Sequence, residues 1–380
     1  MNLLTKFSDN NSDLYISDIK ENAETLLAIL KKVTSTEQGG TFMLKSVSSS
    51  NDEKVEPRIT NNVQVGIYTV KVLKLASIQK NLSDGLYGKE YSLLDEGNYI
   101  FTLAYGEKTV DISVDVKNED TNSILLEKLL YSIENRNAGI YGYIERYGKY
   151  IEKLVLKAKK TGESHSFKLF DKTGRIISYT GLWNIVREAD NARFTFNDKV
   201  YESEENIVFM QEGNLILNLK EASREKIMIS VNIDAFRIEE EIQSFVKKYN
   251  LFFKSLKKIK LSEEIETKMK NLCKVEKESL RDIGFKINSG YSIKINKNIF
   301  KKYLKDDYEK VKKVFVDKND FLLELIKFCG EIIENELITM KSIVKVEEEK
   351  KVINSKAVYT NEGKVVSNEM DLGEKFDFRC

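Results

Sequence analysis

The sequence has one histidine, one proline and three cysteines among 380 residues, and each shortage excludes a class of protein. Because His165 is the sole histidine, a multi-histidine metal site is excluded, and any histidine-dependent triad would have to use this residue. Cys273, Cys329 and Cys380 have no CxxC spacing and are too few for a disulfide scaffold. Cys329 falls in an apolar helical run, which predicts a small buried hydrophobe, and Cys380 is expected to be a free thiol.

Motifs for nucleotide, metal and hydrolase chemistry are also missing. The chain has no Walker-type or GxGxxG phosphate loop, no HExxH, no nucleophile elbow and no EF-hand loop. His165 lies between two serines at a predicted strand edge, which is typical of an ordinary surface histidine, and Gly139 with Gly142 indicates a turn. We therefore assign no catalytic, cofactor-binding or metal-binding residue and expect no cofactor. Carboxylates are so numerous that a glycosidase-like pair stays open, although no pair stands out.

Charge and hydropathy fit an ordinary globular protein of two or three domains. The formal net charge is only +1, with 41% hydrophobic and 32% charged residues, so no overall field favours nucleic acid. Tyrosine and phenylalanine are numerous, and their positions predict core faces of strands and helices. No segment approaches a membrane-spanning run, and the N-terminus lacks the apolar core of a secretory signal. We expect a cytosolic chain or one exported without a cleaved signal.

Residues 190–258 give the clearest structural pattern, which is several short strands followed by one amphipathic helix. Period-two alternation predicts strands around 194–196, 215–219 and 227–233. Asp234 then offers a side-chain oxygen that can cap a helix. The apolar residues of that helix recur at spacings of three and four: Ile238, Ile242, Phe245, Val246, Tyr249, Phe252, Phe253 and Leu256.

The chain before this region changes from helical to β-rich. We predict loose residues at 1–13, a first helix through residues 19–30, and a linker or exposed edge at 46–62, which contains Pro57. A further helix is capped by Thr121 or Ser123 and stops at 137–139. The predicted strands are 63–75, 99–105, 110–116, 140–144, 151–158 and 166–170, with 99–105 and 110–116 as a hairpin. Residues 77–90 are predicted to be irregular, 171–174 to form a turn, and 182–186 are ambiguous.

After residue 260 the pattern is mainly helical. It predicts a charged helical stretch at 262–281, a hairpin at 283–295, one helix through 300–315 and a long helix at 320–344. A short helix is marginal alone in water, so the N-terminal helix must pack on the C-terminal ones. The predicted fold class is therefore α+β, with a helical stem from the N- and C-terminal helices and an inserted antiparallel β-rich head of one or two lobes.

This plan divides the chain into five parts. They are 1–60, the N-terminal helical part of the stem with a linker; 61–188, a β-rich head domain; 189–234, a β domain leading back to the stem; 235–345, the C-terminal helical stem; and 346–380, a flexible tail.

Several segments follow one another in the order of a known family. Residues 66–76 read GIYTVKVLKLA, residues 190–199 read DNARFTFNDK, and residues 231–250 run from a strand through Asp234 to FVKKYN. Other segments follow the same order, at 97–103, 125–133, 205–206, 213–219, 280–295 and 310–315. Together, over roughly residues 60–345, they resemble the flagellar filament cap protein family, also called hook-associated protein two. The chain is similar to a divergent member with shortened terminal segments.

This resemblance implies a structural assembly protein of the bacterial flagellum and not an enzyme. Members of such a family are expected to form a ring homo-oligomer, of about five or six copies, that caps the distal filament end and promotes flagellin polymerisation. The expected location is the extracellular flagellum tip, reached without a cleaved signal peptide. The implied partners are further copies of the chain, flagellin and hook-associated proteins, with an export chaperone or a host surface ligand as further candidates. Nucleic acid and membrane insertion are not expected.

Two other classes stay open on the sequence. A surface adhesin or binding module would use the β-rich head, near residues 63–185, to contact a host glycan or protein. A carbohydrate-active enzyme would need a deep pocket with two convergent acids.

Overall fold

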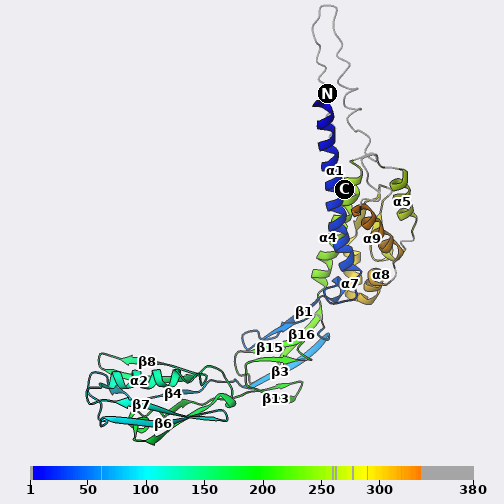
Figure 1. Cartoon of the computed structure of the whole chain (residues 1–380). Coiled ribbons are helices and arrows are strands. Elements are labelled where there is room, and N and C mark those ends of the chain that lie inside the picture. The colour runs from blue at the N-terminus through cyan, green and yellow to red at the C-terminus, as the bar shows by residue number, and fades with distance from the viewer. Residues whose placement is uncertain are drawn as a thin grey trace, which may run out of the picture. The chain divides into compact units, whose positions relative to one another are not determined.

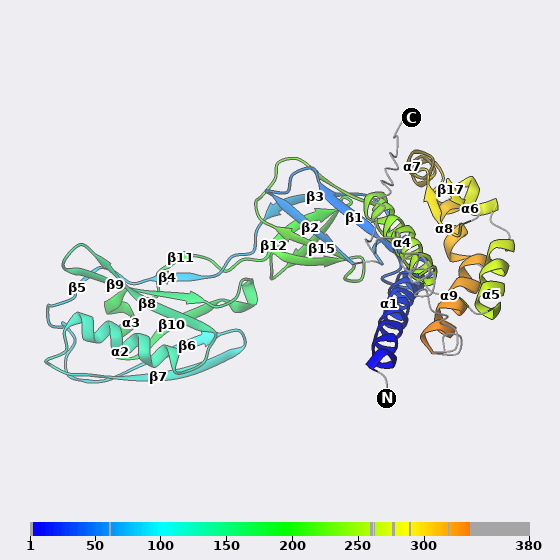
Figure 2. The same cartoon turned by 90° about the horizontal axis from the view of Figure 1, so that it is seen from above.

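The computed structural model describes residues 3–60, 62–258, 261, 263–275, 278–288, 290–317 and 319–334. These divide into two compact units (Figures 1 and 2). The helical unit comprises the chain up to Leu44 and from Asp234 onward, and the β unit comprises Lys45–Ile233. Helices and antiparallel strands are thus segregated along the chain, which confirms the predicted α+β class.

The helical unit is assembled from two separate stretches of chain. Its elements are α1 (Leu3–Val33), a short 3₁₀ helix η1 (Thr41–Met43), α4 (Ala235–Leu256), α5 (Glu263–Lys274), α6 (Glu278–Asp282), α7 (Lys297–Asp306), α8 (Tyr308–Val316), α9 (Asp320–Ile333) and the hairpin β17 (Phe285–Ile287) with β18 (Ile293–Ile295).

Helix α1 packs against both α4 and α9, as the sequence predicts. Its buried stripe recurs at spacings of three and four and consists of Ile19, Ala23, Leu26, Leu30 and Val33. The prediction of loose residues at 1–13 is wrong for 3–13, because α1 begins at Leu3. Neither glycine nor proline interrupts this stretch, and extending an existing helix costs much less than starting one.

Helix α4 forms as its sequence pattern predicts. The side chain of Asp234 accepts a hydrogen bond from the Arg237 backbone N–H at 3.0 Å and caps the helix. All eight apolar residues of the predicted stripe are buried. Phe245 lies among other aromatic rings, with centroids 6.3 Å from Tyr249 and 6.5 Å from Phe315.

The C-terminal part differs from the prediction in how the helices are divided. The single helix expected through 300–315 is broken at Asp307, where the chain leaves α7, and the Asp307 side chain caps α8 by accepting from the Lys310 N–H at 3.2 Å. The charged stretch at 262–281 is likewise two helices, α5 and α6. The predicted long helix is observed as α9 to Ile333, and its later part and the tail at 346–380 lie outside the described residues.

The β unit contains two hydrophobic cores, and we call the parts around them the first and second lobes. Strands of the first lobe are β1 (Lys45–Ser49), β2 (Val55–Ile59), β3 (Gly66–Lys74), β12 (Ala192–Phe196), β13 (Lys199–Ser203), β14 (Ile207–Met210), β15 (Leu215–Leu219) and β16 (Ile227–Ile233). They form a five-stranded sheet, β1-β16-β3-β12-β13, and a three-stranded sheet, β14-β15-β2.

Residues 46–62 are therefore not a linker. Strand β1 pairs with β16 and strand β2 pairs with β15, and each is the last strand of its sheet, so the alternative of an exposed edge is the correct one. Pro57 is tolerated in β2 because an edge strand needs hydrogen bonds on one side only. The polar sequence does not decide between a linker and an edge strand, because strands at the edge of a sheet commonly carry charged side chains.

The second lobe is built from strands of 2 to 9 residues, two α-helices and one 3₁₀ helix. They are β4 (Lys80–Leu82), β5 (Leu86–Tyr87), β6 (Gly97–Tyr105), β7 (Lys108–Val116), α2 (Asn122–Glu134), β8 (Ile140–Tyr147), β9 (Ile151–Ala158), the 3₁₀ helix η2 (Glu163–His165), β10 (Phe167–Thr173), α3 (Ile176–Thr180) and β11 (Ile185–Arg187). One sheet has the order β10-β6-β7, and the other has the order β11-β4-β9-β5 with β8 also paired to β9.

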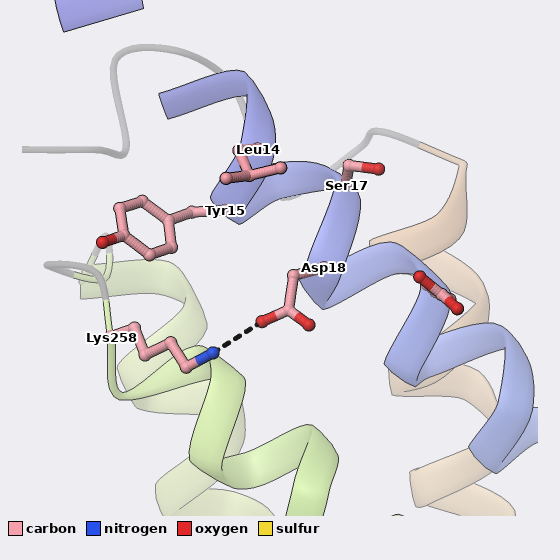
Figure 3. A pocket seen from close by; sticks show the side chains of 6 residues that line it. Leu14, Tyr15, Ser17, Asp18 and Lys258 are labelled. Carbon is pink, nitrogen blue, oxygen red and sulfur yellow. Dashed lines mark hydrogen bonds and ion pairs between the residues drawn. The ribbon is translucent and has the colours of Figure 1, made fainter. Parts of the chain in front are cut away.

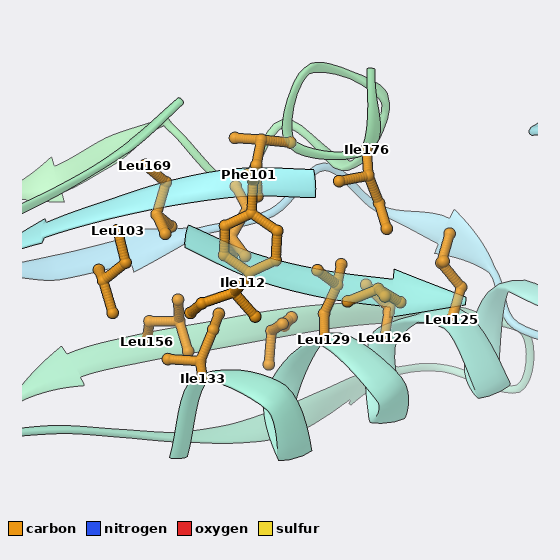
Figure 4. Packing of buried hydrophobic residues seen from close by; sticks show 14 of the residues in the cluster. Phe101, Leu103, Ile112, Leu125, Leu126, Leu129, Ile133, Leu156, Leu169 and Ile176 are labelled. Carbon is orange, nitrogen blue, oxygen red and sulfur yellow. The ribbon is translucent and has the colours of Figure 1, made fainter. Parts of the chain in front are cut away.

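The core of the second lobe is almost entirely aliphatic. Helix α2 is capped by Thr121 and turns Leu125, Leu126, Leu129 and Ile133 toward the strands (Figure 4). Phe101 and Ile112 face them from the β6–β7 hairpin, whose nine paired positions confirm the predicted hairpin. Phe101 and Phe167 are the aromatic residues among the buried residues of this core.

Three local predictions in this lobe are corrected, and the segment left ambiguous at 182–186 is resolved. Residues 77–90 contain β4 and β5, residues 171–173 continue β10, and 185–187 form β11. Gly139 is in a turn with φ of 69°, but Gly142 lies inside β8, so the predicted turn at 139–142 is wrong. A side chain at Gly142 would meet Leu130 and Leu156 at 2.8 Å, so this glycine permits α2 to lie close on the sheet.

Candidate interaction surfaces

The histidine does not form a catalytic arrangement. His165 Nδ1 lies 2.8 Å from Ser164 Oγ and 3.8 Å from Glu204 Oε2. Both contacts fall on the same ring nitrogen, whereas a triad needs the nucleophile and the carboxylate on opposite nitrogens. This geometry fits the surface histidine that the sequence predicts.

The described cysteine side chain is inert. Cys329 is fully buried in α9, and burial raises the pKa of its thiol to about 12, so the thiol stays protonated near neutral pH. The Cys273 side chain and Cys380 lie outside what the structure describes. Within the described part of the chain, no group of three or more histidine, cysteine or acidic residues could hold a metal ion. No helix in that part has the length and apolar character needed to cross a membrane.

A pocket of about 360 Å³ lies between α1 and Lys258, which comes two residues after the end of α4 (Figure 3). Five of its lining residues come from α1, and the sixth is Lys258, whose ammonium group is 2.8 Å from Asp18. These two charges neutralise each other, which leaves Glu21 as the other carboxylate of the lining, and a lone carboxylate is not the convergent pair that a glycosidase needs. Leu14 and Tyr15 at its rim are 67% and 40% exposed, which suits a contact surface better than a reaction site.

A second surface lies on the β8–β9 hairpin of the second lobe. The register pairs Tyr141 with Lys157, Tyr143 with Val155, and Tyr147 with Ile151. Alternate residues of both strands belong to or pack on the aliphatic core, namely Ile140, Ile144, Leu154, Leu156 and Ala158. The paired tyrosines and lysines must therefore lie on the opposite face of the sheet.

Cation–π contacts organise this outer face. The Lys153 ammonium lies 5.2 Å from the centroid of the Tyr147 ring, and that of Lys157 lies 5.0 Å from the Tyr143 ring. A side-chain hydrogen bond with Tyr143 raises the pKa of Lys157, which keeps the lysine charged. Val155, which pairs with Tyr143 and points to this side, is fully buried.

The neighbouring strands extend the face and add positive charge. The pairing of Tyr87 with Ile151 brings a further ring to it, and the pairing of Lys80 with Lys157 brings a further ammonium group. Arg187 follows beside Lys80 on β11. We call the set formed by Tyr87, Tyr141, Tyr143, Tyr147, Lys80, Lys153, Lys157 and Arg187 the tyrosine–lysine face. Its one carboxylate from β8, Glu145, accepts a hydrogen bond from the Tyr147 hydroxyl at 2.7 Å.

These tyrosines correct the prediction that the aromatic residues occupy core faces. Tyr87, Tyr141 and Tyr147 are 53%, 36% and 48% exposed. The alternation of Tyr141, Tyr143 and Tyr147, opposite that of Lys153 and Lys157, was the available signal. The strand itself is predicted at 140–144, but this signal was missed because both of its faces carry apolar or aromatic residues.

A third surface, in the first lobe, is acidic. Glu202 lies near the end of β13, Glu204 and Glu205 follow it in the connection to β14, and all three are exposed; we call this segment the acidic turn. The Thr161 hydroxyl donates to the Glu204 carbonyl at 2.6 Å, and Asn206 both donates to and accepts from the Ala76 backbone at 3.0 and 2.7 Å. The backbone of the turn is thus fixed while its carboxylates remain accessible.

Comparison with known proteins gives one consistent family. The family model described as "Flagellar hook-associated protein 2 C-terminus" matches residues 189–278. The A-type flagellar hook-associated protein 2 of Pseudomonas aeruginosa is 22% identical over 62% of this chain, and the flagellar hook-associated protein 2 of Vibrio cholerae is 23% identical over 48%. The matches span only 52% and 27% of the lengths of these two relatives.

A solved structure shares the fold. The crystal structure of the D1, D2 and D3 domains of the Escherichia coli flagellar cap protein aligns with 85% of this chain and 98% of its own, at a TM-score of 0.60 and 17% identity. At this identity the likeness concerns the fold alone. It extends over both the helical unit and the β unit, because neither unit by itself amounts to 85% of the chain.

Proposed function

We propose that this chain, a divergent member of the flagellar hook-associated protein 2 family, caps the distal end of a flagellar filament and promotes the polymerisation of flagellin there. The observation that carries the proposal is the inserted architecture. A helical unit made from two chain stretches receives a two-lobed β unit between Leu44 and Asp234, and the Escherichia coli cap protein has the same fold.

The chemistry of the surfaces supports an assembly role. In the pocket, Asp18 is paired with Lys258. His165 does not hold a serine and a carboxylate on opposite ring nitrogens, and the thiol of Cys329 is protonated. The described residues instead present a tyrosine–lysine face and an acidic turn, which are surfaces suited to contacts between proteins. The relatives with the same family name are structural proteins of the flagellum, and the chain is proposed to act as they do, without turnover of a substrate.

The helical unit is proposed as the part that engages the filament. The five divisions of the whole chain, 1–60, 61–188, 189–234, 235–345 and 346–380, stay predictions. We expect copies of the chain to form a ring at the extracellular flagellum tip and to contact flagellin and the hook-associated proteins. Export would proceed without a cleaved signal peptide. The adhesin alternative stays a prediction, to be tested by binding of the β unit to host glycans.

Deletion of the gene in its own host tests the proposal. Without the chain, we expect unpolymerised flagellin in the growth medium and short or absent filaments, and expression of the wild-type chain should reverse both. Two matched variants expressed in the deletion strain show whether a folded chain is required, because both introduce the same residue into the same helix. Phe245→Asp, in the buried face of α4, should fail, whereas Phe236→Asp, on a side chain 70% exposed in the same helix, should complement. Normal filaments and a clean medium after deletion would contradict the proposal.

A further inference from the structure

We propose that the tyrosine–lysine face of one copy binds the acidic turn of a second copy. This inference rests on the proposed function, because a capping assembly requires contacts between copies. It goes further by naming the two surfaces that meet, the side chains that carry the contact, and the fact that the two surfaces differ.

The tyrosine–lysine face has the composition of a protein-binding surface. Tyrosine and arginine are enriched in interface cores, and aromatic rings contribute contact area at a small cost in conformational entropy. The rings of Tyr143 and Tyr147 are already held by Lys157 and Lys153, at 5.0 and 5.2 Å from the ammonium groups. Little ordering is therefore needed when a partner binds.

The face also requires a partner of negative charge. Lys80, Lys153, Lys157 and Arg187 give it four cationic groups, and Glu145 gives one carboxylate on the same side of β8. Since the whole chain has a formal net charge of only +1, this excess is local. Opposite charge steers encounter and fixes the register of the contact.

The acidic turn supplies the complementary charge from within the same chain. Its three exposed carboxylates stand on a backbone anchored by Thr161 and Asn206, so the turn is as preorganised as the face. Within a copy, Glu202 and Glu204 lie 3.6 and 3.8 Å from Arg193 and His165, and not against the face. The four side chains are between 33% and 61% exposed, so a better-placed partner can replace these pairs at little cost.

The geometry of such a contact leads to larger assemblies. The face and the turn are different surfaces, so each copy that offers its turn to one neighbour keeps its face free for another. A contact of this head-to-tail kind produces a closed ring when the rotation between copies closes. A second copy is therefore the occupant that both the charges and the proposed capping role favour.

Charge exchange on the full-length chain tests the inference. Lys153→Glu with Lys157→Glu reverses the face, and Glu202→Lys with Glu204→Lys reverses the turn. Sedimentation velocity over a concentration series should show that each reversed chain self-associates at least about tenfold more weakly than the wild type. A 1:1 mixture of the two should associate like the wild type, and so should one chain carrying all four changes, because opposite charges then meet again.

A control chain with Lys108→Glu and Lys168→Glu has the same change in net charge on exposed residues of β7 and β10, and it should associate like the wild type. The inference is overturned if the wild-type chain stays monomeric, if the control is weakened equally, or if mixing restores nothing. It is also overturned if the face variant self-associates normally but loses binding to heparin, which would assign the face to an anionic polymer. In all these cases the deletion assay reports on the capping role separately.

Discussion

The helical unit turns most of its described phenylalanine rings inward, with Phe236 as an exception, whereas the second lobe of the β unit turns many of its tyrosine rings outward. In the helical unit Phe42 lies 5.2 Å from Phe315, Phe252 lies 5.8 Å from Phe328, and Tyr249 is 1% exposed. In the second lobe the core is aliphatic, and Tyr87 and Tyr147 are about half exposed.

The difference shows that one residue class serves two purposes in one chain. A ring that touches other rings on all sides adds area and edge-to-face contacts to folding stability. A ring held flat on a sheet by a lysine adds little to stability and remains available to a partner. Substitutions in the two regions should therefore affect different measurements.

The largest effect is expected from Phe245→Asp in α4. This side chain is 1% exposed among Tyr249 and Phe315, and a lone buried carboxylate has no partner there. We expect a loss of about 4 kcal/mol or more, enough to unfold the helical unit. Urea unfolding followed by circular dichroism measures it, with Phe236→Asp as the exposed control on the same helix. Equal midpoints for the two variants would show that this face of α4 is not buried.

Leu129→Ala in α2 should have the next largest effect. Leu129 is fully buried in the aliphatic core of the second lobe (Figure 4), and its truncation leaves a cavity. The expected cost is about 3 kcal/mol. Tyr131→Ala, on a side chain 72% exposed in the same helix, should change the free energy of unfolding by less than about 0.5 kcal/mol. A cost below about 1 kcal/mol for Leu129→Ala would contradict the packing described.

Asp234→Ala should weaken the start of α4. Its side chain accepts from the Arg237 N–H at 3.0 Å, and loss of an N-cap typically costs about 1 kcal/mol. Asp234→Asn should recover most of the loss, since the amide oxygen can also cap. Thermal unfolding of the three chains in one buffer decides this, and an alanine variant as stable as the wild type would exclude a capping role.

Asp120 should make the second lobe more sensitive to acid. Burial raises the pKa of Asp120, but the hydrogen bonds from Lys128 and from the Lys117 backbone outweigh it and hold the pKa below its ordinary value of 3.8. A carboxylate with a lowered pKa contributes stability above the ordinary value, and this contribution is lost as the pH falls through the lowered one. Asp120→Asn should cost about 1 kcal/mol at pH 7. The gap from the wild type should narrow as the pH falls below the ordinary value of 3.8, and a gap independent of pH would refute the assignment.

The smallest stability change is expected for Tyr147→Ala on the tyrosine–lysine face. Its ring is 48% exposed, so the free energy of unfolding should shift by less than about 0.5 kcal/mol. Self-association should nevertheless weaken, because Lys153 loses the ring that positions it. Sedimentation and urea unfolding on the same preparations test this contrast directly. A stability loss as large as that of Leu129→Ala would remove the distinction between the two regions.

Local signals predicted the elements that local physics controls. The α4 stripe, its Asp234 cap and the β6–β7 hairpin were readable because spacing, capping and turn residues agreed within a few residues of one another. The fold class followed from the order of these elements. No interaction surface was predicted from the residues themselves.

The failures lie where distant strands decide the structure. Strands β4 and β5 have only three and two residues, too few to display a period, and they exist because β9 pairs with them. In β8, tyrosines alternate with isoleucines, so both faces look apolar and the alternation does not say which one is buried. The packing of α2 on one face settles that question.

The insertion point between the two units has a consequence for how such chains can change over time. Leu44 and Asp234 are 190 positions apart, yet the Asp234 N–H donates to the Leu44 carbonyl at 3.0 Å, and Lys45 pairs with Ile233 directly beyond them. The chain therefore leaves and re-enters the helical unit at two adjacent positions, Leu44 and Asp234. Gene rearrangements that lengthen, shorten or replace the inserted stretch Lys45–Ile233 need not disturb α1 or α4. The sequence and size of the inserted β unit can accordingly vary, while the helices on either side of the insertion stay unchanged.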